Sequence, residues 1–95
     1  MAAKREDYSA RDAEGRHYPL VMIDWVDSSS MAGWHAGAPS GQLTQCRSVG
    51  WLIHDGEVAK VIAGHIADET GEAMQRNSEM TIPAAAITKL RRIGP

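Results

Sequence analysis

Residues 48–66 read SVGWLIHDGEVAKVIAGHI, and they carry the strongest local structural signal in the chain. Two runs rich in valine and isoleucine flank the pair Asp55-Gly56. An Asp-Gly pair between such runs predicts a tight two-residue hairpin, because glycine tolerates the positive φ angles that these turns require. This turn would place His54 opposite Glu57 on the neighbouring strand.

The same register predicts which side chains of the hairpin share a face. One face would carry Val49, Trp51, Ile53, Val58 and Ile62, and the other would carry Leu52, Ala59, Val61 and Ala63. Both faces are largely apolar, whereas a sheet with one solvated face alternates apolar and polar residues more clearly. We therefore expect a barrel wall with a partner covering its outer side.

The segments on either side of this hairpin predict further strands. Residues 18–27 predict a strand that places Val21, Ile23 and Trp25 on one face and Met22, Asp24 and Val26 on the other. Residues 68–79 are polar and predict a connecting loop. Pro83, followed by three alanines, fits either the first turn of a helix or a tight turn between two short strands.

Residues 28–47 predict a long loop, because they combine glycines, serines and a proline. Such a length is unusual in a compact domain and is typical of functional or disordered loops. Trp34 lies in this polar segment. We expect it to fold back as a lid on the core, and the functional alternative is stacking against a base or against an aromatic ring of a partner.

The composition predicts one small domain that gains from self-association. The chain has 95 residues, a net charge of -2 and no phenylalanine. Such a thin core favours a homo-oligomer, since association buries additional apolar surface. Residues 1–17 predict a flexible N-terminal arm with one helical turn through residues 9–14, and residues 18–95 predict the domain itself.

The same composition predicts a cytoplasmic protein. Cys46 is the only cysteine and has no partner for an intrachain disulfide. No apolar run reaches the roughly 20 residues that span a bilayer. The first sixteen residues contain no apolar stretch of the kind found in secretion signals. We expect no contact with a membrane.

Three fragments resemble small proteins that are encoded by phages and prophages. They are W-x-D-S-x-S-x-x-G-W at residues 25–34, S-V-G at residues 48–50, and T-I-P-x-x-x-I at residues 81–87. The order of the expected strands over residues 20–93 is also similar to that of Sm-like members of the SH3-like barrels.

This resemblance implies a fold, an assembly and a setting. The fold would be an all-β, five-stranded SH3-like or Sm-like barrel in which a short 3₁₀ turn joins the last two strands, and for this reason we prefer strand–turn–strand for residues 80–93. The assembly would be a homo-oligomer of the ring type. The setting would be the cytoplasm of a bacteriophage host, with inhibition of host defence as the implied role.

Catalytic and metal sites are weakly indicated. Ser28–Ser30, Asp24, Asp27 and His35 supply the residue types of a hydrolase triad, but the G-x-S-x-G elbow is absent. The four histidines and Cys46 show no close ligand spacing such as C-x-x-C. We expect no enzyme, no metal site and no cofactor, and keep a small hydrolase as the less favoured alternative.

A binding site is better indicated. The glycine-rich residues 33–41 lack the lysine of a nucleotide-binding P-loop, but they can present N–H groups and hydroxyls to an anion. The predicted ligand-binding residues are Asp27, Ser28, Ser30, Trp34, His35, Arg91 and Arg92. The sequence predicts a non-enzymatic oligomeric module that binds or sequesters a nucleotide, an RNA segment or a host protein. The alternative is a structural or scaffold protein without a ligand.

Overall fold

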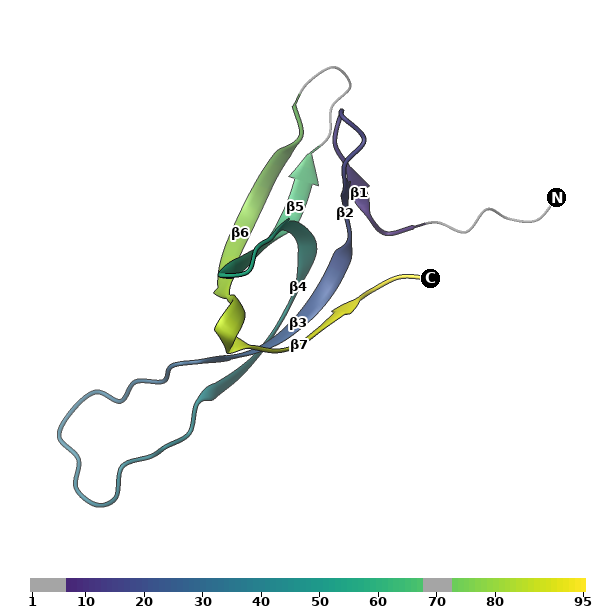
Figure 1. Cartoon of the computed structure of the whole chain (residues 1–95). Coiled ribbons are helices and arrows are strands. Elements are labelled where there is room, and N and C mark those ends of the chain that lie inside the picture. The colour runs from purple at the N-terminus through teal and green to yellow at the C-terminus, as the bar shows by residue number, and fades with distance from the viewer. Residues whose placement is uncertain (1–6, 68–72) are drawn as a thin grey trace.

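The computed structural model describes residues 7–67 and 73–95. Its elements, in chain order, are β1 (Ala10–Arg11), β2 (His17–Tyr18), β3 (Leu20–Asp27), β4 (Thr44–Asp55), β5 (Ala59–Ala67), β6 (Gln75–Pro83), the 3₁₀ helix η1 (Ala84–Ala86) and β7 (Ile87–Arg92) (Figure 1). The prediction of a small, mainly β protein is confirmed. Among the described residues, no helix is long and apolar enough to cross a membrane.

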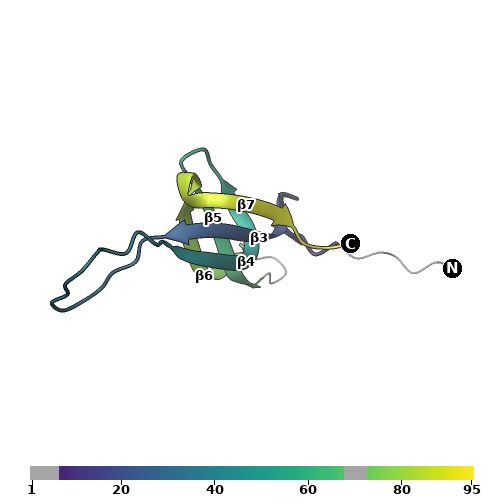
Figure 2. The ribbon, with the colours of Figure 1, turned by 90° about the horizontal axis from the view of Figure 1, so that it is seen from below.

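Five of the strands form one antiparallel sheet with the order β6-β5-β4-β3-β7. The sheet curls strongly, so that β6 and β7 approach one another near η1 (Figures 1 and 2). Within the described ranges these two edge strands are not hydrogen-bonded to each other. The sheet is therefore an open, barrel-like curl and not a closed barrel.

The core lies on the concave side of this curl. Its fully buried side chains include Val21 and Ile23, with exposed fractions of 1% and 0%. Residues two apart on a strand point to the same face, so this pair confirms the face predicted for residues 18–27. The other members of the buried cluster are Leu52, Ile62 and Ile82, and Trp25 and Ile87 pack against it.

The predicted register of the β4–β5 hairpin is wrong. Asp55 pairs with Lys60, so the turn is wider than two residues, and the N–H of Gly56 donates to the carbonyl of Ala59 at 3.1 Å. The register also shifts between Leu52 and His54. The wider turn and this bulge together change which residues face each other across the two strands.

The faces predicted for this hairpin change accordingly. Leu52 pairs with Ile62, and both side chains lie in the buried cluster, whereas the two-residue turn would have placed them on opposite faces. A bulge inserts one unpaired residue, and a shift of one residue moves the following side chains to the other face. Val49 and Val58, predicted to share a face with Ile62, are exposed, whereas Ile62 is buried.

The strand–turn–strand reading of the C-terminal segment is confirmed. Residues 84–86 form the single 3₁₀ turn between β6 and β7. Two predicted loops are shorter than expected, because β6 begins at Gln75 and β4 begins at Thr44. Residues 68–72 of the predicted connecting loop lie outside the described residues.

The helical turn predicted for residues 9–14 is wrong. Ala10–Arg11 pairs instead with His17–Tyr18 in a small hairpin that leads directly into β3. The segment before this hairpin lies against the sheet, where the indole N–H of Trp51 donates to the carbonyl of Tyr8 at 2.9 Å. The described part of the predicted arm, residues 7–17, therefore contributes a second, two-stranded sheet.

Candidate functional site

The β3–β4 loop, residues 28–43, projects away from the sheet (Figures 1 and 2). It begins and ends at the pair Asp27–Thr44, where the two strands separate. Gly33 and Gly37 have φ angles of 93° and 97°, which lie in the region that glycine adopts without strain. The loop contains no Asp, Glu, Lys or Arg. It is therefore an uncharged projection from a charged protein.

Trp34 lies near the middle of this loop and is fully exposed, with an exposed fraction of 103%. The prediction that Trp34 covers the core is wrong. Met31 and Leu43, on either side of it in the sequence, are also exposed, with fractions of 70% and 56%. The loop therefore presents its apolar side chains to solvent, whereas a chain with a thin core would have gained free energy by burying them.

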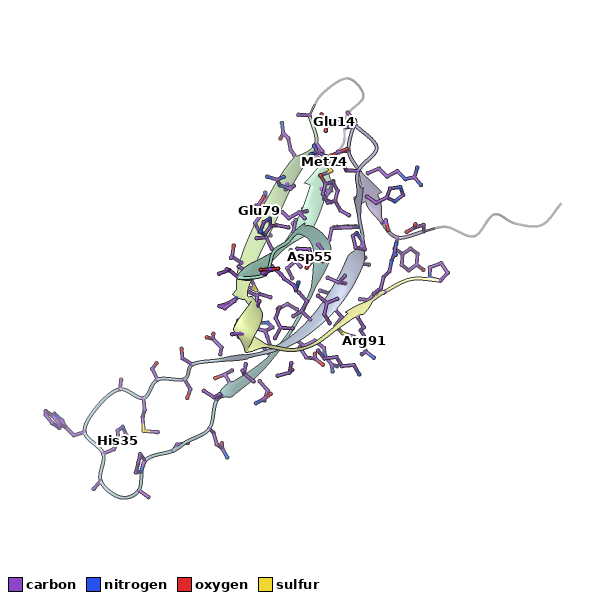
Figure 3. The ribbon with its side chains drawn as sticks, in the orientation of Figure 1. Glu14, His35, Asp55, Met74, Glu79 and Arg91 are labelled. Carbon is purple, nitrogen blue, oxygen red and sulfur yellow. The ribbon has the colours of Figure 1, made fainter. Side chains whose placement is uncertain are left out.

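The polar groups of the loop bond to the loop itself. The Ser29 hydroxyl donates to the carbonyl of Gln42 at 3.0 Å, and Asp27 accepts the N–H of Ser28 at 2.8 Å. The His35 ring lies 2.8 Å from the carbonyl of Ala32 (Figure 3). These bonds hold the loop's shape and do not pair a serine hydroxyl with the imidazole, which a hydrolytic nucleophile requires.

The structure divides the predicted ligand-binding residues into two groups. Asp27, Ser28, Ser30, Trp34 and His35 belong to the loop and its root, and all are exposed. Arg91 and Arg92 lie on β7, opposite Met22 and Val21 of β3. Val21 and Met22 lie six and five positions before Asp27, which is about 20 Å and about 17 Å along a strand. A small ligand bound at the loop does not reach both arginines of the same chain.

A polar cluster that the sequence did not predict lies on the convex side of the sheet, near the root of the β3–β4 loop. Asp24 of β3 accepts two hydrogen bonds from Arg47 of β4, from Nε at 2.7 Å and from a terminal nitrogen at 3.2 Å. The Thr88 hydroxyl donates to the Asp24 carbonyl at 3.1 Å. These residues, with Gln45 and Cys46, line an open hollow of about 360 Å³.

The electrostatics of this cluster are those of a satisfied ion pair. The hydrogen bonds from Arg47 lower the pKa of Asp24, and those same bonds raise the pKa of the guanidinium. Both groups therefore stay charged at neutral pH. The carboxylate of Asp24 and the guanidinium of Arg47 are ion-paired with each other. Cross-strand pairing of Asp24 with Arg47 depends on the β3–β4 register, and an alternating pattern alone does not give that register.

A second unpredicted cluster surrounds Asp12 in the β1–β2 hairpin. Its carboxylate accepts hydrogen bonds from the Tyr18 hydroxyl at 2.8 Å and from Arg16 Nε at 2.6 Å. Both partners come from the same hairpin, so the cluster holds the turn in place. A hollow of about 150 Å³ adjoins it, lined in part by Glu14 and Met74 (Figure 3).

Comparison with models of protein families, with curated proteins and with solved structures gives no match to this chain. The sequence and the geometry of the chain itself are therefore the basis for assigning a function.

Proposed function

We propose that this protein is a non-enzymatic binding module whose β3–β4 loop inserts into an apolar pocket of a partner protein. The observation that carries the proposal is the full exposure of Trp34 on an uncharged projecting loop. Tryptophan is enriched among the few residues that dominate the free energy of protein–protein binding, and long projecting loops insert into concave surfaces. Met31 and Leu43 are further exposed apolar side chains of the same loop.

The charges of the loop favour a protein partner over a nucleotide or an RNA segment. Contacts from Lys and Arg to phosphates supply most of the affinity for nucleic acids, and residues 28–43 contain neither residue. Arg91 and Arg92 lie about 17 Å and about 20 Å from the loop root along the sheet. Of the ligands that the sequence predicted, a host protein fits this surface best.

A hydrolase finds less support in the loop. The hydroxyl of Ser29 and the ring of His35 both bond to backbone carbonyls. A scaffold protein without a ligand is the remaining alternative. The two differ in what replacement of Trp34 would do. In a scaffold without a ligand it would leave the interactions of the protein unchanged, whereas in a binding module it would weaken them.

The proposal includes an Sm-like barrel and self-association. The strand order β7-β3-β4-β5-β6 and the single 3₁₀ turn before β7 support the Sm-like relationship. Nearly every residue of β6 is exposed, and its outer edge is unpaired within the described ranges, which supports β6 as the surface that a second copy covers. Light scattering tests this, with a dimer or larger species expected and a monomer at high concentration contradicting it.

The setting proposed for this binding is the cytoplasm of a phage host. The three sequence fragments described above support this part of the proposal, and inhibition of a host factor is the role that they favour. A host protein with an apolar pocket is then the partner to seek.

Crosslinking inside cells tests the proposed function. A photoreactive benzoylphenylalanine at position 34 should give one protein adduct, identified by mass spectrometry. The same group at position 58 is the matched control, because Val58 is also exposed, at 86%, but lies in the β4–β5 turn. Equal adducts from both positions, or none from position 34, would contradict the proposal.

A further inference from the structure

β7 forms one edge of the main sheet. It pairs with β3 on one side, and within the described ranges no strand pairs with its other side. An edge strand of this kind offers a row of N–H and C=O groups to another extended chain. This edge is a separate surface from the β3–β4 loop.

The hydrogen bonds identify which backbone groups face the open edge. The N–H of Ile93 donates to the carbonyl of Leu20 at 2.8 Å, so these residues form a hydrogen-bonded pair at the end of the β3–β7 ladder. Bonded and non-bonded pairs alternate along an antiparallel ladder. Leu90 and Arg92 therefore direct their N–H and C=O groups away from β3, towards the open side.

The side chains of β7 give this edge a defined chemistry. Lys89 lies opposite Asp24 and Arg91 lies opposite Met22, so both cations share the convex face of the sheet. Asp24 is already held by Arg47. Within the described residues, neither Lys89 nor Arg91 has an acidic partner within ion-pair distance. On the concave face, Leu90 remains 37% exposed.

We propose that β7 accepts an extended segment of a partner protein as an additional strand, and that this segment alternates acidic and apolar residues. The acidic residues would lie opposite Lys89 and Arg91, where opposite charges on neighbouring strands attract. The apolar residue between them would cover Leu90. Figure 3 shows Arg91 on β7, well separated from His35 in the projecting loop.

The charges disfavour a second copy of this chain as the occupant. A second β7 would bring like charges opposite each other, which destabilises strand pairing. The edge strand β6 is no better matched, because its Arg76 and Glu79 already pair at 2.7 Å and leave no negative charge. An acidic strand from another protein is the better complement to Lys89 and Arg91.

Titration with a synthetic peptide of alternating glutamate and valine tests the proposal, with hydrogen exchange as the readout. Saturating peptide should slow exchange of the Leu90 and Arg92 amides by about tenfold or more, because a new ladder protects them. Binding without this protection would mean that charge alone attracts the peptide, and it would overturn the proposal. Protection of both amides before any peptide is added would show that a second copy holds the edge, and would overturn it too.

Variants test the charge requirement. Lys89→Glu combined with Arg91→Glu should raise the Kd for this peptide by about tenfold, through two cross-strand pairs, and should create binding to the matching lysine–valine peptide. Arg11→Glu, on β1, is the control and should leave both affinities unchanged. An oligothymidine that binds the protein as tightly as the acidic peptide would overturn the proposal in favour of general anion binding.

Because β7 and the loop are separate surfaces, Trp34→Ala should bind the peptide as the unaltered protein does. Loss of peptide binding in that variant would contradict the independence of the two surfaces. Failure of the peptide experiment would leave the crosslinking test of the loop unaffected.

Discussion

Asp12 shows how one residue organises the β1–β2 hairpin. Its side chain is only 8% exposed. Burial opposes its ionisation, but hydrogen bonds from the Tyr18 hydroxyl and from Arg16 outweigh this effect and lower the pKa of Asp12 to about 2. A carboxyl whose pKa is lower in the folded state stabilises that state above its unfolded pKa. This contribution is lost as the pH falls from about 4 to about 2.

Removing one hydrogen-bond donor to Asp12 should narrow this pH window from its lower end. In Tyr18→Phe the Asp12 pKa should rise, because the carboxylate loses the hydrogen bond from the hydroxyl. The loss of the stability that Asp12 contributes should still begin near the unfolded pKa of about 4, but it should be complete at a higher pH and be smaller in total. An NMR titration of the Asp12 carboxyl carbon measures the pKa, with Tyr8→Phe as the control. An unchanged Asp12 pKa in Tyr18→Phe would contradict this account.

At the scale of elements, Gly50 sets the close approach of β4 to β5. A Cβ built at Gly50 would lie 2.8 Å from the carbonyl oxygen of Ala63 and 3.1 Å from the Cβ of Ile62. A Cβ atom cannot stay this close to a backbone oxygen, so an added methyl group would force the neighbours to move. Both neighbours, Ile62 and Ala63, belong to a buried part of β5. Glycine at position 50 therefore allows β4 to approach the backbone of Ala63 this closely.

Gly50→Ala should lower the free energy of unfolding by about 1–3 kcal/mol, as other over-packed sites do. Gly41→Ala is the matched control, because a Cβ at Gly41 meets nothing within 4 Å. Urea unfolding of both variants measures the difference. Equal stability of the two variants would show that β4 and β5 lie farther apart than described.

The elements differ in how far the sequence determines them. The alternation of Val21, Ile23 and Trp25 correctly predicts the buried face of β3, because a strand periodicity is local information. The bulge between Leu52 and His54 depends on how β4 bends over the core, and this is not local. The pair Asp55-Gly56 is present in the sequence, yet the chain uses a wider turn there.

The candidate site shows the same division. Glycine, serine and proline content correctly indicates a long loop near residues 28–43, and it singles out Trp34. Whether this tryptophan packs on the core depends on the direction in which the loop leaves the sheet, which composition does not encode. The separation of Arg91 from the loop follows from the β3–β7 register, and this register is set by tertiary pairing.

At the scale of the whole molecule, the sheet and the loop are separable. The molecule measures 66 × 31 × 23 Å, and the β3–β4 loop projects along its length. The buried cluster contains no residue of the loop. The fold therefore does not depend on the loop, which leaves its sequence available for a role in binding.

Replacing residues 28–43 with Asn-Gly should preserve the fold. This pair favours a tight hairpin between Asp27 and Thr44, and closing a shorter loop costs less conformational entropy. We expect a native-like circular dichroism spectrum and a Tm that is not lower than that of the full chain. A collapse of the fold in this variant would mean that the loop contributes to the core.

The central claim is that Trp34 anchors a protein complex. The most direct test is the Kd, measured by calorimetry, between this protein and the purified partner crosslinked through position 34. Trp34→Ala should raise that Kd by about 30-fold or more, as loss of an interface anchor does, while Val58→Ala leaves it unchanged. A Kd for Trp34→Ala equal to that of the unaltered protein would contradict the claim.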